Sequence, residues 1–435
     1  MYLQTKLQGG NLLNLVDGSL TTVDVIVDDV TGKVAAIGEN LGHVDEVIQL
    51  NGEVLLPGFV DLHVHLRDPG FTDKETIATG AAAAAAGGFT QIACMPNTNP
   101  PLDSPAQLDY VTQRSREAGA ARVLPIACIT ERQEGNTLTD FERLKCSGAV
   151  ALSDDGKGVQ DGGLMREALI QAKKAGLPVA IHAEDESISG PGVLNEGAAK
   201  RLGLPAIPGA AESAMIARDI LLAEETGAHI HICHVSVESA VALVRFAKER
   251  GVSITAEVTP HHLLLSDDLI TADDGNFKVN PPLRSQRDKE ACLRGFLDGT
   301  LDVVATDHAP HTESEKAQGI KKAPFGLVGI ETVFPLLYTY LVVPGLMSLS
   351  ELVKRMSTLP SQAFGLPGGV IRAGGPADIA VVDLETERDI LPENFLSKGR
   401  NTPFANWRAS GWTKLTIQGG RVVFRDSMAK ATVGE

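Results

Sequence analysis

The chain has 435 residues, more than one compact core usually holds unless that core is a large α/β barrel. Hydrophobic residues make up 43% and charged residues 22%, which is an ordinary globular composition. The net charge of -16 argues against a nucleic-acid-binding surface, which needs a basic stripe. An anionic ligand must therefore be bound by a few local cations.

The cysteines and the apolar segments indicate a cytoplasmic protein. The five cysteines are widely spaced and contain no CxxC pair, so a disulfide framework or a cysteine-based zinc site is not expected. The start, MYLQTKLQGG, lacks the features of a signal peptide. No segment approaches the roughly 20 apolar residues that cross a bilayer. We therefore predict no contact with membranes.

Residues 1–53 predict short hairpin strands. The apolar runs 23–27 and 34–37 flank Gly32, and both have the β-branched character of strands. This segment alone is too short for a stable core. We expect it to be one part of a small β-sandwich, formed together with residues 371–435.

Residues 54–370 predict a (β/α)8 TIM barrel. Within this segment a short apolar run that ends in polar residues recurs eight times, and helical candidates such as 161–175, 210–226 and 237–250 lie between the runs. Eight such units over about 250 residues fit the barrel. The runs are 54–65, 89–97, 122–130, 149–155, 178–185, 229–236, 253–262 and 302–311.

Residues 371–435 repeat the strand pattern of the amino-terminal segment. Apolar runs at 378–382, 415–417 and 422–424 are separated by glycine turns. We expect this segment to complete the β-sandwich, a discontinuous domain that flanks the barrel. The predicted fold class is α/β.

Polar side chains gather where the predicted barrel strands end. In a TIM barrel these carboxyl ends form one face, where catalytic groups lie. The residues at the strand ends are His63, His65, Arg67, Asn97, Asp154, Asp155, His182, His231, His234, Asp307, His308 and His311. Imidazole and carboxylate groups without a thiolate suit zinc, or a similar divalent ion, in an open catalytic site.

Simpler interpretations apply to several single residues. A lone HxH pair is more often incidental, although strand geometry turns His63 and His65 to the same face. We predict Asp161 to be a helix N-cap. The pair His261-His262 remains open between ligand binding and shaping the end of a strand. The joint occurrence of the polar residues at the strand ends is what favours a metal site.

The sequence resembles the dihydroorotase family of the amidohydrolase superfamily. Residues 61–67, DLHVHLR, resemble the DxHxHxR motif of the superfamily. Residues 69–75, 95–101 (MPNTNPP), 280–284 (NPPLR) and 307–311 (DHAPH) resemble dihydroorotase motifs. The resemblance covers essentially the whole chain and implies the barrel with a flanking β domain.

The resemblance also implies the metal ligands. His63, His65 and Asp307 would bind the more buried ion, and His182 and His234 would bind a second one. Many relatives carry a carbamylated lysine at the end of the fourth strand, where this chain has Asp154-Asp155-Gly156. Long-chain bacterial dihydroorotases are similar in placing an aspartate there, and we predict Asp155 rather than Asp154 as the bridge. One or two zinc ions are expected, with two favoured.

The implied reaction is the reversible hydrolysis of dihydroorotate to N-carbamoyl-L-aspartate in pyrimidine biosynthesis. A metal-activated hydroxide attacks the ring amide, and Asp307 serves first as general base and then as general acid. The resemblance assigns Arg67, Asn97 and His311 to the substrate carboxylate, and Asn280 is expected at the ureido edge. The segment 324–329 is expected to form either a loop at the mouth or the first turn of the next helix.

Two other functions compete with this interpretation. A hydantoinase or allantoinase would share the fold and the metals, but those relatives usually keep the bridging lysine. A silent partner subunit of aspartate transcarbamoylase would typically have lost metal ligands, and all the expected ones are present here. A homodimer would be the ordinary state, and association with aspartate transcarbamoylase is left open by the sequence.

Overall fold

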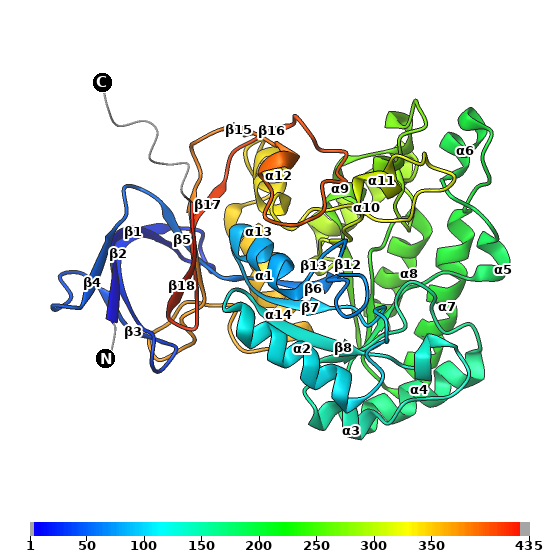
Figure 1. Cartoon of the computed structure of the whole chain (residues 1–435), viewed down its shortest axis with the longest axis horizontal. Helices are drawn as coiled ribbons and strands as arrows, with labels where there is room; N and C mark the ends of the chain where they lie inside the picture. Colours follow the sequence, from blue (N-terminus) through cyan, green and yellow to red (C-terminus); the bar gives the residue numbers. More distant parts are fainter. Residues whose placement is uncertain (1–3, 427–435) are drawn as a thin grey trace.

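Eight parallel strands form the centre of the molecule in a computed structural model that describes residues 4–426 (Figure 1). Neighbouring strands pair in chain order, and a parallel bridge between Val64 and His308 joins the last segment to the first. This arrangement confirms the predicted (β/α)8 barrel. The strands are β6 (Phe59–Val64), β7 (Phe89–Cys94), β8 (Arg122–Ala127), β9 (Ala151–Leu152), β10 (Val179–Ile181), β11 (Ile230–Ile232), β12 (Ile254–Val258) and β13 (Val303–Val304).

Helices follow the strands and surround the barrel (Figure 1). The long ones are α1 (Ile77–Ala86), α2 (Pro105–Ala118), α4 (Gly162–Ala175), α7 (Gly209–Thr226), α8 (Glu238–Glu249) and α10 (Gln286–Asp298). Shorter ones are α3 (Phe141–Cys146), α5 (Glu186–Ser189), α6 (Glu196–Leu202), α9 (Pro260–Leu264), α11 (Glu313–Lys316), α12 (Val333–Leu337), α13 (Leu349–Val353) and α14 (Leu359–Ala363).

Local sequence signals fix where several helices begin and end. Asp161 caps α4 by accepting a hydrogen bond from the backbone N–H of Leu164, as the sequence predicts. Gly176 and Gly227 end α4 and α7 in the left-handed conformation, which costs glycine little. The alanine-rich α1 buries its small side chains, which lets it lie close to β7 and to two strands of the flanking sheet.

The two ends of the chain combine in one eight-stranded sheet on one side of the barrel, blue and red in Figure 1. Its strands are β1 (Gln4–Leu13), β2 (Leu20–Asp28), β3 (Lys33–Gly38), β4 (Glu46–Gln49), β5 (Val54–Pro57), β14 (Ile379–Asp383), β17 (Trp412–Gln418) and β18 (Arg421–Arg425). A separate short pair joins β15 (Arg388–Asp389) to β16 (Arg408–Ala409). Buried side chains from both ends, such as Val25 and Val381, share one core. The flanking β domain is thus built from both ends, and its strands are continuous in one sheet.

The apolar run 54–65 forms two strands that belong to different sheets. The strand β5 pairs with β1 and β14 of the terminal sheet, whereas β6 opens the barrel. The chain crosses between the two sheets at Gly58, where a Cβ atom would collide with the side chain of Thr90. We therefore propose a domain boundary at Gly58 in place of residue 53, and we keep the second boundary near residue 371.

Within residues 4–426 no helix combines the length and apolarity that a membrane span requires.

Candidate active site

Six side chains predicted as metal ligands converge at the carboxyl ends of the barrel strands. His63 and His65 leave β6 on one face, and Asp307 follows β13. The Nε2 atom of His65 lies 3.0 Å from Asp307 Oδ1, and the Nε2 atom of His63 lies 3.5 Å from the same oxygen. Two ligands about 2.1 Å from one tetrahedral ion lie about 3.4 Å apart. The spacing of these three groups therefore fits one shared cation.

A second group of donors adjoins the first at Asp155. The Nδ1 atom of His182 lies 3.0 Å from His234 Nε2 and 3.3 Å from Asp155 Oδ1. Asp155 also reaches the first group, because its Oδ1 atom lies 3.5 Å from His63 Nε2 and its Oδ2 atom lies 3.5 Å from His65 Nε2. This carboxylate therefore faces both groups of imidazoles.

Asp154, the other candidate bridge, turns away from the imidazoles. Its carboxylate accepts hydrogen bonds from the backbone N–H groups of Ile129 and Thr130 and from the Thr130 hydroxyl. These bonds secure the loop that follows β8. The geometry therefore favours Asp155 as the bridging carboxylate.

Two buried atoms at the centre of the site lack a hydrogen-bond partner among the residues that the structure describes. His63 Nε2 and Asp155 Oδ1 make no hydrogen bond to any residue among 4–426. A buried polar atom without a partner costs about 1–3 kcal/mol, so such atoms call for an explanation. A divalent cation supplies one, because it binds imidazole nitrogen and carboxylate oxygen together. The donors present thus fit a metal ion.

The charges of these groups also suit a cation. Burial would raise the pKa of both Asp155 and Asp307, but the neighbouring imidazoles, His63 first among them, lower the pKa of each carboxyl below its ordinary value. Both carboxylates are therefore anionic at neutral pH.

A cavity of about 120 Å³ opens directly beside the donor groups. Its lining includes Arg67, Asn97 and Asn280, three of the four residues predicted to bind substrate. The carbonyl oxygen of Asn97 lies 2.9 Å from His65 Nδ1, which leaves the amide nitrogen of Asn97 free to donate. Asn280 donates to Glu184 Oε2 at 2.5 Å. The cavity therefore has a metal-binding side and a side rich in hydrogen-bond donors.

His311 lies just behind Arg67 at the edge of the cavity. Its Nε2 atom lies 3.0 Å from Arg67 Nη2, from which it accepts a hydrogen bond when the ring proton is on Nδ1. The same atom lies 2.8 Å from the carbonyl oxygen of Phe325, to which it donates in the other tautomer. Burial and the charges of Arg67 and Lys74 lower the pKa of His311 to about 2. The imidazole is therefore neutral at pH 7, and Arg67 supplies the positive charge at this end of the cavity.

The segment 324–329 lies at the mouth of the cavity, the first of the two places expected for it. Phe325 and Gly326 line the cavity. The buried Nζ of Lys316 donates to the carbonyl oxygens of Lys278, Pro324 and Gly326 at 2.9–3.1 Å. These hydrogen bonds hold the segment against the barrel.

Three residues of the site have left-handed backbone conformations. Arg67 has φ 59°, His234 has φ 35° and Asp307 has φ 48°. Residues other than glycine adopt this region rarely, and such conformations cluster at functional sites. Each of the three follows a barrel strand, so the unusual turn aims its side chain into the site.

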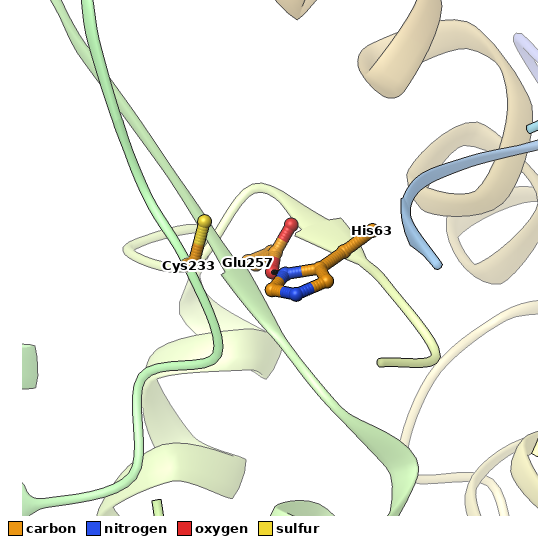
Figure 2. A group of neighbouring side chains, drawn as sticks. All are labelled: His63, Cys233 and Glu257. Carbon is orange, nitrogen blue, oxygen red and sulfur yellow. Dashed lines mark hydrogen bonds and ion pairs between the residues drawn. The ribbon is translucent and has the colours of Figure 1, made fainter. Parts of the chain in front are cut away.

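Two carboxylates next to the proposed ligands are not among the residues predicted from the sequence. Glu184 lies 3.4 Å from His182 Nε2, and Glu257 lies 2.6 Å from His63 Nδ1. Glu257 is the single charged residue of the buried strand β12, and that is the signal that could have identified it. Figure 2 shows Glu257 against the ring of His63, with Cys233 in the same group. Burial raises the pKa of the Cys233 thiol, so Cys233 is a neutral packing residue.

Comparison with known proteins identifies the family. Residues 52–240 match the sequence model of a family described as Dihydro-orotase-like. A dihydroorotase of Halalkalibacterium halodurans is 50% identical over 426 residues, which cover 98% of this chain and 99% of the relative. The chain belongs to the dihydroorotase family. A dihydroorotase of Geobacillus kaustophilus is 52% identical over 386 residues, which cover 88% of this chain and 90% of the relative.

Solved structures of related enzymes share the fold of this dihydroorotase family member. The L-hydantoinase of Arthrobacter aurescens has a TM-score of 0.85 at 25% identity and covers 97% of this chain and 96% of its own. The dihydropyrimidinase of Brevibacillus agri has a TM-score of 0.83 at 25% identity, with 97% and 95% covered. The chain is therefore a cyclic amide hydrolase in which a metal cofactor fits the strand-end donors.

Proposed function

We propose that this chain catalyses the reversible hydrolysis of dihydroorotate to N-carbamoyl-L-aspartate with two zinc ions. Six groups would hold the metal, with Asp155 shared between the two sets of imidazoles. The observation that carries the proposal is the pair of unpartnered buried atoms, His63 Nε2 and Asp155 Oδ1, beside a cavity that contains Arg67. The proposed ligands are His63, His65, Asp155, His182, His234 and Asp307.

Bound zinc would supply Lewis-acid chemistry, lowering the pKa of a water molecule and polarising the ring carbonyl. Imidazole and carboxylate ligands without a thiolate support zinc as the ion. The donor atoms form two sets that meet at Asp155. Contacts within a set, or between a set and Asp155, measure 3.0–3.8 Å, and the presence of two sets supports two zinc ions per chain.

Asp307 is the proposed proton carrier. Its carboxylate is ionised at neutral pH and lines the cavity, so it can accept a proton from the attacking water. As the new C–O bond forms and the ring C–N bond breaks, Asp307 returns that proton to the leaving nitrogen. The new carboxylic acid then releases its own proton to solvent. In the reverse reaction, N-carbamoyl-L-aspartate takes up one proton and closes to the ring with release of one water molecule.

Arg67 is the proposed anchor for the substrate carboxylate. Its guanidinium lines the cavity, and a guanidinium can bind a carboxylate with two parallel hydrogen bonds. Asn97 would donate to the same carboxylate, and the neutral ring of His311 would hold the position of Arg67. Asn280 would contact the ureido edge of the ring. A carboxylate-bearing substrate explains why a partly buried arginine lines the cavity.

The two rival functions make different demands on this site. A hydantoinase substrate without a carboxylate would leave Arg67 facing no anion, which favours dihydroorotate. A silent partner subunit has no need for six converging donors. A homodimer and an association with aspartate transcarbamoylase both stay predictions, and the proposed mechanism uses residues of one chain alone.

We expect purified protein to turn over dihydroorotate with a kcat/KM at least about 100-fold above that for hydantoin or allantoin. The reason is that a site built to pair with a carboxylate discriminates strongly against ligands that lack one. Steady-state assays with the three substrates measure the ratio. Preference for hydantoin or allantoin would retain the fold and the metal chemistry but reject dihydroorotate as the substrate. A protein that binds zinc and turns over none of the three would support the silent-subunit interpretation.

A further inference from the structure

A buried carboxylate lies beneath the proposed metal ligands. Glu257 of β12 is 0% exposed, and its Oε1 atom lies 2.6 Å from His63 Nδ1 (Figure 2). The same oxygen accepts a hydrogen bond at 3.1 Å from the backbone N–H of His234. One carboxylate oxygen therefore contacts a residue from each of the two proposed donor sets.

The second oxygen of Glu257 is also engaged. Its Oε2 atom lies 2.9 Å from Nε2 of the fully buried His231. The other nitrogen of His231 lies 2.8 Å from Thr255 Oγ1, and Thr255 Oγ1 lies 3.2 Å from His229 Nε2. These contacts run along β11 and β12 away from the active-site cavity. They restrict the carboxylate to one orientation.

The contact determines which nitrogen of His63 faces the other donors. With Nδ1–H donating to Glu257, the lone pair of His63 lies on Nε2, the atom that is buried without a partner beside Asp155 and Asp307. A carboxylate on the far nitrogen of a ligand imidazole also raises the basicity of the ring. Packing alone does not explain a charged residue here, because burying a carboxylate is costly.

We propose that Glu257 is a positioning residue that orients His63 for metal binding, with His231 holding Glu257 in place. This inference rests on the proposed function, since it takes His63 as a metal ligand. Glu257 does not itself line the cavity. It reaches the site through the His63 ring and the His234 backbone N–H, and of these two contacts the His63 ring is the one that carries a proposed ligand atom.

The test is zinc affinity measured by competition with a chromophoric chelator. Glu257→Gln keeps the shape and loses the charge, and we expect the zinc dissociation constant to rise about 10- to 100-fold. The matched control is Asp219→Asn. Asp219 is an equally buried carboxylate on α7 whose partner is Arg218, so its zinc affinity should stay within about twofold of the unmutated protein.

A double-mutant cycle distinguishes positioning from a general loss of structure. In a His63→Ala background, Glu257→Gln should no longer change the zinc dissociation constant, because the residue through which it acts is gone. An equal loss with and without His63 would overturn the proposal, as would unchanged affinity in the single variant. If Glu257→Gln does not fold, the zinc dissociation constant is measured for His231→Gln instead. Weakened zinc binding by that variant supports the proposal, and unchanged binding rejects it.

The outcome also separates this inference from the proposed function. Unmutated protein that binds no zinc would reject the ligand assignment itself and this inference with it. Zinc binding by the unmutated protein, with unchanged affinity in Glu257→Gln, would reject only the positioning role.

Discussion

Asp307→Asn should lower kcat for dihydroorotate hydrolysis by at least about 10³-fold. The change removes the proposed proton carrier, and general acid–base catalysis contributes about 10²- to 10⁴-fold. It also removes one oxygen from the donor group that includes His63 and His65. The neutral amide is close in size to the carboxylate, so the fold should persist. Initial rates at saturating dihydroorotate, with bound zinc counted in the same sample, measure both effects.

Asp154→Asn is the matched control for this variant. Asp154 also follows a barrel strand and is buried, but its carboxylate bonds Ile129 and Thr130 instead of facing the donors. We expect its activity to stay within about tenfold of the unmutated protein, because an amide oxygen can still accept those hydrogen bonds. Activity of Asp307→Asn equal to that of Asp154→Asn would reject the proton-carrier role.

Arg67→Met should lower kcat/KM for dihydroorotate by about 30-fold to several thousand-fold. Removing one partner of a buried, hydrogen-bonded charge pair costs about 2–5 kcal/mol, and each 1.4 kcal/mol is a factor of ten. Arg67→Lys should recover part of the loss, since it restores the charge without the paired geometry. Steady-state kinetics of both variants, with thermal unfolding as a check on the fold, test the role.

The control for the arginine is Arg355→Met. Arg355 is buried, and its guanidinium donates to the carbonyl oxygen of Leu301, which precedes β13 and so lies on the amino-terminal side of that strand. This variant should lose stability with little change in kcat/KM. If Arg67→Met turns over dihydroorotate as efficiently as Arg355→Met does, the substrate carboxylate is bound elsewhere.

The barrel and most of the site could be predicted because their signals are local. Each strand lies in an apolar run, several helices such as α4 and α10 have a side-chain cap of their own, and the barrel geometry brings the strand ends to one face. Residues as far apart as His63 and Asp307 could therefore be placed together from their positions in their own runs. The assignment of the site residues to ligand and substrate roles stays a prediction until it is measured.

Other features depend on contacts between distant segments, which the sequence alone does not specify. The run 54–65 looks like one strand, and pairing of its first part with β1 and β14 divides it at Gly58. The bond between Glu257 and His63 joins residues 194 positions apart. The left-handed turns at His234 and Asp307 oppose local preference and are imposed by the surrounding barrel.

Hydrolysis of dihydroorotate should depend on a divalent cation held by the strand-end donors. The most direct measurement follows the hydrolysis rate of one protein sample as purified, after removal of metal by a chelator, and after return of zinc. We predict loss of activity on chelation and recovery as about two zinc ions rebind per chain. Full activity in protein shown by elemental analysis to be free of metal would reject a metal-dependent reaction.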